Sequence, residues 1–145
     1  MNVRKIIASL FILIALVFGV ILYLDIQYPK DVQTYFRKEF YTQFGPLAIC
    51  LEMIFSAYYL YRNDKKANFY LALFASTILF DIVFNLAGLF TSSIPDLIAY
   101  VLMGCGFVSF WIAFTDSFKT GLISWKETIL SIVMGVLVEL FFNYL

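Results

Sequence analysis

Long apolar runs alternate with short polar segments along the whole chain. Each run has between 17 and 23 residues, and the runs cover 6–24, 44–61, 68–90, 97–114 and 129–145. A helix needs roughly 17–25 apolar residues to cross the hydrocarbon core of a bilayer. The pattern therefore predicts an all-α integral membrane protein, in which residues 1–145 form one domain, a five-transmembrane-helix bundle.

The second run contains one carboxylate, and so does the fifth, which ends at the last residue of the sequence. A four-span variant, in which one of these two is re-entrant or interfacial, therefore stays open. Composition agrees with the membrane class, because 63% of the residues are hydrophobic and 14% are charged, with a mean hydropathy of +0.90. A soluble domain has only about 45–50% apolar residues and about 25% charged ones.

Basic residues are distributed unevenly between the two predicted sides of the membrane. Five spans place seven of them on the side of the N-terminus and three on the other. Cytoplasmic loops retain Lys and Arg, so we expect a cytoplasmic N-terminus and a bacterial-type inner (cytoplasmic) membrane. The formal net charge is zero, which gives no indication of a nucleic-acid partner. The seven are Arg4, Lys5, Arg62, Lys65, Lys66, Lys119 and Lys126, and the three are Lys30, Arg37 and Lys38.

The longest polar segment between the runs, residues 25–43, has an amphipathic pattern on the predicted outer side. Its apolar residues recur at helical spacing, namely Val32, Tyr35, Phe36 and Phe40. This spacing predicts a short helix lying on the membrane surface, with Asp31 as its N-cap. Such a helix is either a lid over a site between the spans or an interfacial connector.

Three acidic residues, Glu52, Asp81 and Glu139, lie inside apolar runs, whereas every Lys and Arg lies outside them and the chain has no His. A carboxylate inside the membrane is costly and by default marks a functional site. Counted from the predicted cytoplasmic ends of their spans, the three lie nine, thirteen and ten residues in. A rise of about 1.5 Å per residue places them in one layer on the order of 6 Å thick near the midplane.

Small and polar residues extend from each acid along one helix face, because positions four apart share a face. Thr77 and Asn85 flank Asp81, Ser56 follows Glu52, and Ser131, Gly135 and Asn143 align with Glu139. We expect these faces to converge, so the candidate ligand- or ion-binding residues are Glu52, Asp81, Glu139, Asn85, Thr77, Ser56 and Ser131. The fourth run offers Gly104, Cys105, Gly106 and Ser109 for close packing and is expected to close the site. The first run is expected at the periphery.

Carboxylates in such a layer can hold a proton, bind a metal cation through oxygen, or pair with an amine. The sequence therefore predicts a small membrane protein that binds or translocates a proton, a cation or a small amine-bearing ligand. No spacing typical of Mg²⁺ or Ca²⁺ ligands is present, so the identity of any metal stays undefined. We expect no cofactor.

An assembly role is an alternative, because an acid in one span can meet a basic residue in the span of a partner. In this case the chain is a non-catalytic accessory subunit. Its expected partners are the lipid bilayer and the other chains of a homo-oligomer or a larger membrane complex. An enzyme is less favoured. Without His there is no Ser-His-Asp relay or His-based zinc site, and Cys50 and Cys105 form no CxxC pair.

A third reading comes from the order of Asp25, Glu52 within residues 50–55, and the segment FDIVFNLAGLF over residues 80–90. This order resembles the EXPERA family of sterol isomerases and sigma-2-type ligand receptors. The resemblance implies a buried pocket for a sterol or amine, faced by Glu52. The sequence departs from that pattern in three ways: Asp25 lies near the outer surface, the histidine of the isomerases is missing, and the fifth run has no counterpart in the receptors.

Overall fold

The computed structural model describes residues 2–89 and 94–144, and within these ranges the chain is helical and forms no strand. Four stretches are long and apolar enough to span a membrane, namely 3–24, 38–62, 67–86 and 96–115. A further helix of 20 residues follows them. The long helices are α1 (Val3–Leu24), α3 (Gly45–Arg62), α4 (Ala67–Leu86), α5 (Asp96–Thr115) and α6 (Trp125–Tyr144).

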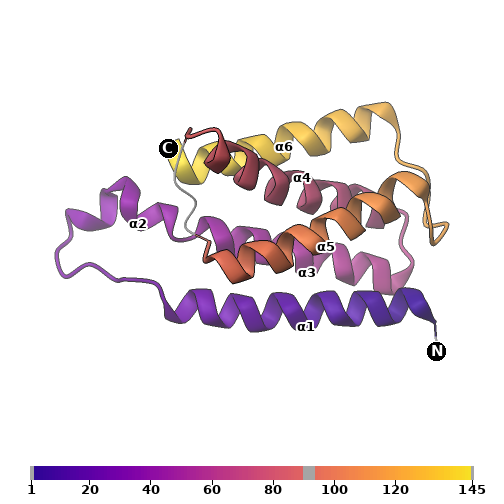
Figure 1. The fold of residues 1–145 in the computed structure, drawn as a ribbon, viewed down its shortest axis with the longest axis horizontal. Coiled ribbons are helices and arrows are strands. Elements are labelled where there is room, and N and C mark those ends of the chain that lie inside the picture. Colours follow the sequence, from indigo (N-terminus) through magenta and orange to yellow (C-terminus); the bar gives the residue numbers. More distant parts are fainter. Residues whose placement is uncertain (1, 90–93, 145) are drawn as a thin grey trace.

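The long helices lie side by side, with the two chain ends at opposite ends of the bundle (Figure 1). α4 is the central element, since it contacts α3, α5 and α6. α1 packs mainly on α3 along one edge, which is the peripheral position expected from its scarcity of small and polar residues. The bundle thus has an α1–α3 side and an α6 side, with α4 between them.

Local signals fix where the helices begin and end. α3 ends at Asn63, whose left-handed backbone (φ 58°) stops the helix. The guanidinium of Arg4 donates a hydrogen bond of 2.9 Å to the carbonyl of Leu60 in the last turn of α3, which ties the start of α1 to this end. α6 begins with a capping box, in which Glu127 accepts from the Ser124 N–H and the Ser124 hydroxyl accepts from the Glu127 N–H.

The helices α4 and α6 differ at one end from the apolar runs that predicted them. α4 stops at Leu86 instead of continuing to Phe90, and Gly88 follows with a positive φ of 76°. Only glycine adopts this conformation readily, so the chain turns here. α6 begins at Trp125, four residues before the apolar run, because the capping box recruits polar residues into its first turn. Phe90 and Leu145 lie outside the described residues.

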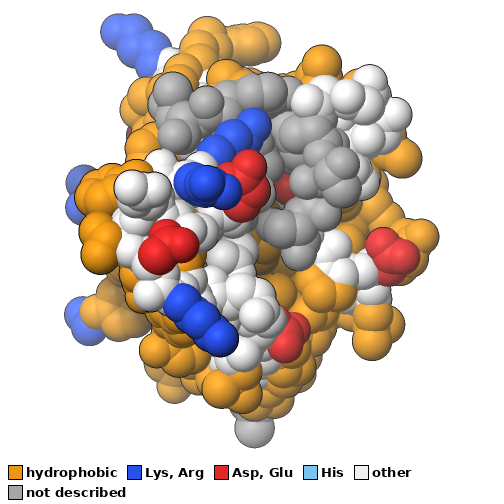
Figure 2. All heavy atoms as spheres, turned by 90° about the vertical axis from the view of Figure 1, so that its left-hand side faces the viewer, with side chains coloured by type: hydrophobic (Ala, Val, Ile, Leu, Met, Phe, Trp, Pro, Cys, Tyr) orange, Lys and Arg blue, Asp and Glu red, His pale blue; other side chains and the backbone are white. Residues whose placement is uncertain are grey.

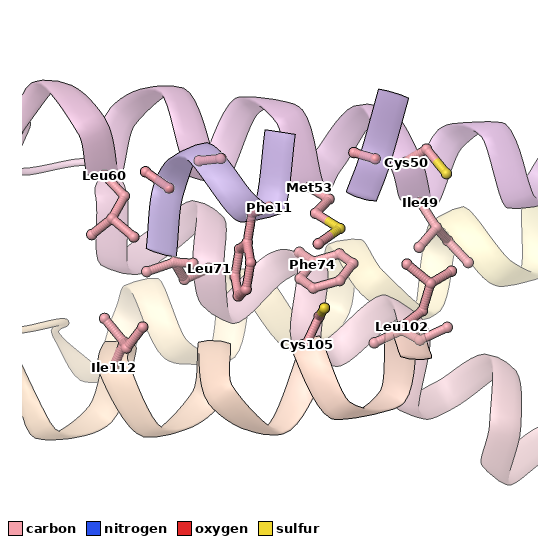
Figure 3. Packing of buried hydrophobic residues seen from close by; sticks show 14 of the residues in the cluster. Phe11, Ile49, Cys50, Met53, Leu60, Leu71, Phe74, Leu102, Cys105 and Ile112 are labelled. Carbon is pink, nitrogen blue, oxygen red and sulfur yellow. The ribbon is translucent and has the colours of Figure 1, made fainter. Parts of the chain in front are cut away.

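The apolar core lies between α1, α3, α4 and α5. Phe11, Met53, Phe74 and Cys105 come from these four helices and point toward one another (Figure 3). All four are buried. None of the buried residues of this cluster belongs to the described part of α6, so α6 joins the bundle by other contacts.

The outer segment does not form the single helix that its spacing suggests. A 3₁₀ turn, η1 (Thr34–Phe36), and a short helix, α2 (Lys38–Thr42), are separated by the extended residue Arg37. Asp31 caps the 3₁₀ turn, because its carboxylate accepts from the Thr34 hydroxyl (2.6 Å) and N–H (2.7 Å). The Thr34 hydroxyl and N–H hold the pKa of Asp31 below its usual value.

The apolar residues of this segment do not share one face. Val32 and Phe36 are exposed, whereas the Phe40 ring contacts the rings of Tyr28, Tyr35 and Phe44. This aromatic cluster folds the segment back on itself, and α2 contacts α6. Charged side chains gather on this end of the molecule, with apolar side chains around them (Figure 2).

α5 packs closely on α4 at Gly106. A β-carbon placed there would lie 2.8 Å from Cγ2 of Ile78, whereas one at Gly104 would meet nothing within 4 Å. We therefore expect Gly106→Ala to lower the free energy of unfolding by about 1–3 kcal/mol through overpacking. The matched control, Gly104→Ala on the same helix, should be neutral or slightly stabilising. Thermal unfolding in detergent measures both, and equal midpoints for the two variants would contradict this packing.

Candidate functional site

Three helices bring the three buried acids together. Glu52 comes from α3, Asp81 from α4 and Glu139 from α6. The carboxyl groups of Asp81 and Glu139 are in hydrogen-bonding contact, and Glu139 is also close enough to Glu52 to interact with its charge. Glu52 is in hydrogen-bonding contact with Thr77 on α4. The layer inferred by counting residues is therefore also a cluster in space.

The three acids differ in exposure. Asp81 and Glu139 are only 5% and 3% exposed. Glu52 is half-buried, yet its Oε2 atom is inaccessible and has no hydrogen-bond partner. A buried acceptor without a partner costs about 1–3 kcal/mol. Glu52 therefore has an unused binding position, whereas Asp81 and Glu139 bind each other.

A close approach of α6 to α4 creates the Asp81–Glu139 contact. A β-carbon at Gly135 would lie 3.0 Å from Cβ of Ser76 and 3.1 Å from the backbone nitrogen of Thr77. Only glycine leaves room for this approach. Glu139 lies one helical turn beyond Gly135, and Asp81 lies one turn beyond Thr77, so the two carboxyls meet just after the point of contact.

A second close contact lies on the opposite side of the acids, where α3 begins and α6 ends. A β-carbon at Gly45, in the first turn of α3, would lie 3.3 Å from Cβ of Phe142 on α6. Gly45 precedes Glu52 by about two turns, and Phe142 follows Glu139 by about one. The acid cluster is thus bracketed by one glycine contact on each side, the first with α4 and the second with α3.

The predicted hydroxyl residues lie on the buried faces, but their protons are already used. Thr77 donates to Leu73 O (2.9 Å), Ser56 to Met53 O (2.8 Å) and Ser131 to Thr128 O (2.8 Å). Their oxygens remain able to accept a hydrogen bond. Of these three residues, Thr77 is in contact with Glu52, whereas Ser131 lies about two turns away from Glu139 along α6.

Two further predicted positions differ from the buried set. Asn85 is exposed, one turn beyond Asp81 along α4, so it is placed at the border of the cluster. The side chain of Asn143 lies outside the described residues. Ser76 was not singled out in the sequence, but its hydroxyl is buried without a partner beside Gly135. Its spacing of five from Asp81 gave no helical-face signal.

α5 does not close the site. Its small residues were expected to do so, and Cys105, Gly106 and Ser109 are indeed buried. However, Gly106 approaches Ile78 and Ala75 of α4, whereas the acids lie where α4 meets α3 and α6. The helix that closes the site is α6, through Gly135.

The arrangement favours proton chemistry over metal binding. Among residues 2–89 and 94–144, no group of three His, Cys, Asp or Glu side chains is placed to hold a metal ion. Ionised carboxylates only accept hydrogen bonds, so two carboxyls in hydrogen-bonding contact need a proton between them. Asp81 and Glu139 can therefore store one proton in a site that excludes water.

Comparison with family models, curated proteins and solved structures finds no match for this chain. The resemblance of Glu52 and residues 80–90 to the EXPERA family therefore stays an expectation from the sequence.

The shared proton predicts a pH-dependent stability. Raising the pH removes this proton and leaves two negative charges in contact, which repel by on the order of 4 kcal/mol at an effective dielectric constant of about 20. We therefore expect the melting temperature of the wild type to fall toward alkaline pH. Asp81→Asn and Glu139→Gln, which leave one charge and an amide donor, should lose less.

Thermal unfolding across a pH series measures this difference. Glu39→Gln is the matched control, since Glu39 is an exposed acid on α2, and its profile should follow the wild type. Identical alkaline losses in all four proteins would contradict a shared proton between Asp81 and Glu139.

Proposed function

We propose that this chain is a small polytopic membrane protein that binds and translocates a proton at the Asp81–Glu139 pair, in exchange for a cationic or amine-bearing ligand at Glu52. The observation that carries the proposal is the contact between two carboxyls that are each more than nine-tenths buried. Buried acids inside membrane spans are used by proton-coupled transporters.

The proposed topology has five spans with the N-terminus in the cytoplasm. Support comes from the two chain ends, which lie at opposite ends of the bundle (Figure 1), as an odd number of crossings requires. α6 contributes the fifth crossing in this topology. Its acid Glu139 is buried, whereas its outward face is apolar and exposed, with Ile129, Val133 and Leu137 suited to lipid contact.

The Asp81–Glu139 pair and Glu52 have different roles in the proposed exchange. In this proposal, Asp81 and Glu139 share one proton. Glu52 has an oxygen without a hydrogen-bond partner, and an ammonium group supplies the charge-assisted donor that this oxygen lacks. A cation at Glu52 disfavours a second positive charge nearby, so its arrival promotes release of the proton from the pair. This coupling is electrostatic and requires only that the three acids stay close.

Proton transport gives the direct test. In proteoliposomes with a membrane potential and a gradient of a small amine, the wild type should move protons in exchange for the amine, as followed by an enclosed pH-sensitive dye. Glu52→Gln, Asp81→Asn and Glu139→Gln should each reduce the rate by roughly tenfold or more, since a positioned proton-transfer group contributes on the order of 10²–10⁴-fold. Glu39→Gln should keep the wild-type rate.

The outcomes separate transport from assembly. Wild-type rates in all three variants, or no flux in folded wild type under any gradient, would remove the transport proposal. If the variants instead release a protein that co-purifies with the wild type from native membrane, the acids serve an accessory subunit.

Topology is tested by thiol labelling in intact cells. Cys50 and Cys105 are buried and are replaced by Ala, and single cysteines are placed at the exposed positions Lys30 and Lys126. A membrane-impermeant maleimide should label Lys30→Cys but not Lys126→Cys until the cells are opened. Labelling of both in intact cells would contradict an odd number of crossings between them and the proposed orientation.

A further inference from the structure

A cavity of about 650 Å³ lies far from the acid cluster, at the end of the bundle where α4 and α6 begin. Its walls combine charge with apolar and aromatic surface. The lining residues are Lys65, Lys66, Phe69, Tyr70, Gly121, Leu122, Glu127 and Leu130. No part of the proposed proton site uses this cavity.

The wall formed by the connection between α5 and α6 is held rigidly. Asn68, which is 1% exposed, donates from its amide nitrogen to the carbonyl of Gly121 (2.7 Å) and to Oδ1 of Asp116 (2.9 Å). The same Oδ1 accepts from the Gly121 N–H (3.1 Å). The carboxylate of Asp116 is thereby engaged in the wall, and Asp116 does not line the cavity.

Glycine is required at the point where this wall meets α4. Gly121 has a φ of 138°, and a β-carbon there would contact Lys65 at 3.7–3.9 Å. L-residues rarely adopt this backbone conformation. The loop therefore lies against Lys65 in a fixed conformation, and the cavity exists before any ligand arrives.

The charge of the lining favours an anion. Two lysines face one acid, and Oε2 of Glu127 already accepts the Ser124 N–H in the capping box. Two helix N-termini also begin here, those of α4 and α6, and each carries a partial positive charge. Lys66 Nζ lies over the Tyr59 ring, 5.9 Å from its centroid, so it is held near the cavity side of α4 by a cation–π contact.

The apolar half of the lining indicates that the anion is attached to a hydrophobic chain. Phe69, Leu122 and Leu130 lie beside the lysines, and the neighbouring Trp125 is 82% exposed, as an interfacial anchor is. A water-soluble phosphate would gain nothing from this surface. We propose that the cavity binds an anionic phospholipid, with its phosphate at Lys65 and Lys66 and an acyl chain along Phe69 and Leu130.

This inference rests on the membrane placement of the proposed function but not on its proton chemistry. Lipid binding can therefore hold when proton transport fails, and the reverse is also possible. The two proposals use different residues and different measurements, so failure of one is distinguishable from failure of the other.

Native mass spectrometry of the purified full chain tests the proposal, with phosphatidylglycerol titrated against phosphatidylcholine and phosphatidylethanolamine. The wild type should retain phosphatidylglycerol preferentially. Each lysine near the surface contributes about 1 kcal/mol, or roughly fivefold, so Lys65→Gln with Lys66→Gln should weaken binding by roughly 30-fold. Lys119→Gln with Lys126→Gln is the matched control at the same end, since neither residue lines the cavity, and it should leave affinity unchanged.

A second variant tests the role of Glu127. Glu127→Gln keeps a capping-box acceptor but removes the only acid in the lining, so phosphatidylglycerol should bind a few-fold more tightly. Equal losses in the two lysine pairs, or equal retention of the zwitterionic lipids, would overturn the proposal. Full competition by soluble glycerol phosphate at millimolar concentration would also overturn it, because the ligand would then be a phosphorylated solute.

Discussion

The contact of the α6 backbone with α4 at Gly135 is the constraint on which the candidate site depends. A β-carbon there would lie within 3.1 Å of both Ser76 and Thr77 atoms, and one turn further along the two helices Asp81 meets Glu139. Two ionised carboxylates at this separation repel strongly in a medium of low dielectric constant. In the proposed function, the α4–α6 contact and the shared proton therefore stabilise each other, so that loss of the proton weakens the packing of α6.

α4 separates two environments that differ in the residues packed against it. On one side, Phe11, Met53, Phe74 and Cys105 interlock in an apolar core built from four helices. On the other side, α6 contacts α4 through a glycine and two carboxyls, and the described residues of α6 contribute none of the buried members of that core. In the proposed function, α6 is therefore the helix whose packing depends most directly on the protonation of the acid pair.

Hydropathy alone predicted an all-helical chain with apolar helices of spanning length, because each helix must bury its own backbone polar groups in a membrane. The convergence of Glu52, Asp81 and Glu139 followed from residue spacing and depth. Spacing could not decide which glycine brings its helix next to the acids, since Gly106 and Gly135 both approach α4 but on different residues, Ile78 and Ala75 for Gly106 and Ser76 and Thr77 for Gly135. The outer segment was also less predictable. Its helical spacing competes with an aromatic cluster around Phe40, and the cluster broke the expected helix into η1 and α2.

The difference in exposure within the cluster sets the order of events in the proposed exchange. Asp81 and Glu139 are buried, whereas Glu52 is half-buried and therefore reaches the molecular surface. The contact between Gly45 and Phe142 restricts the outer side of the cluster, and α2 contacts α6 at the same end. A ligand that approaches the pair therefore encounters Glu52 first. Glu52 also contacts Thr77, which lies one helical turn from Asp81 on α4. A ligand bound to the unpartnered oxygen of Glu52 therefore acts one turn away from Asp81. In the proposed exchange, the half-buried Glu52 is therefore the entry point, and the buried pair holds the proton that the ligand displaces.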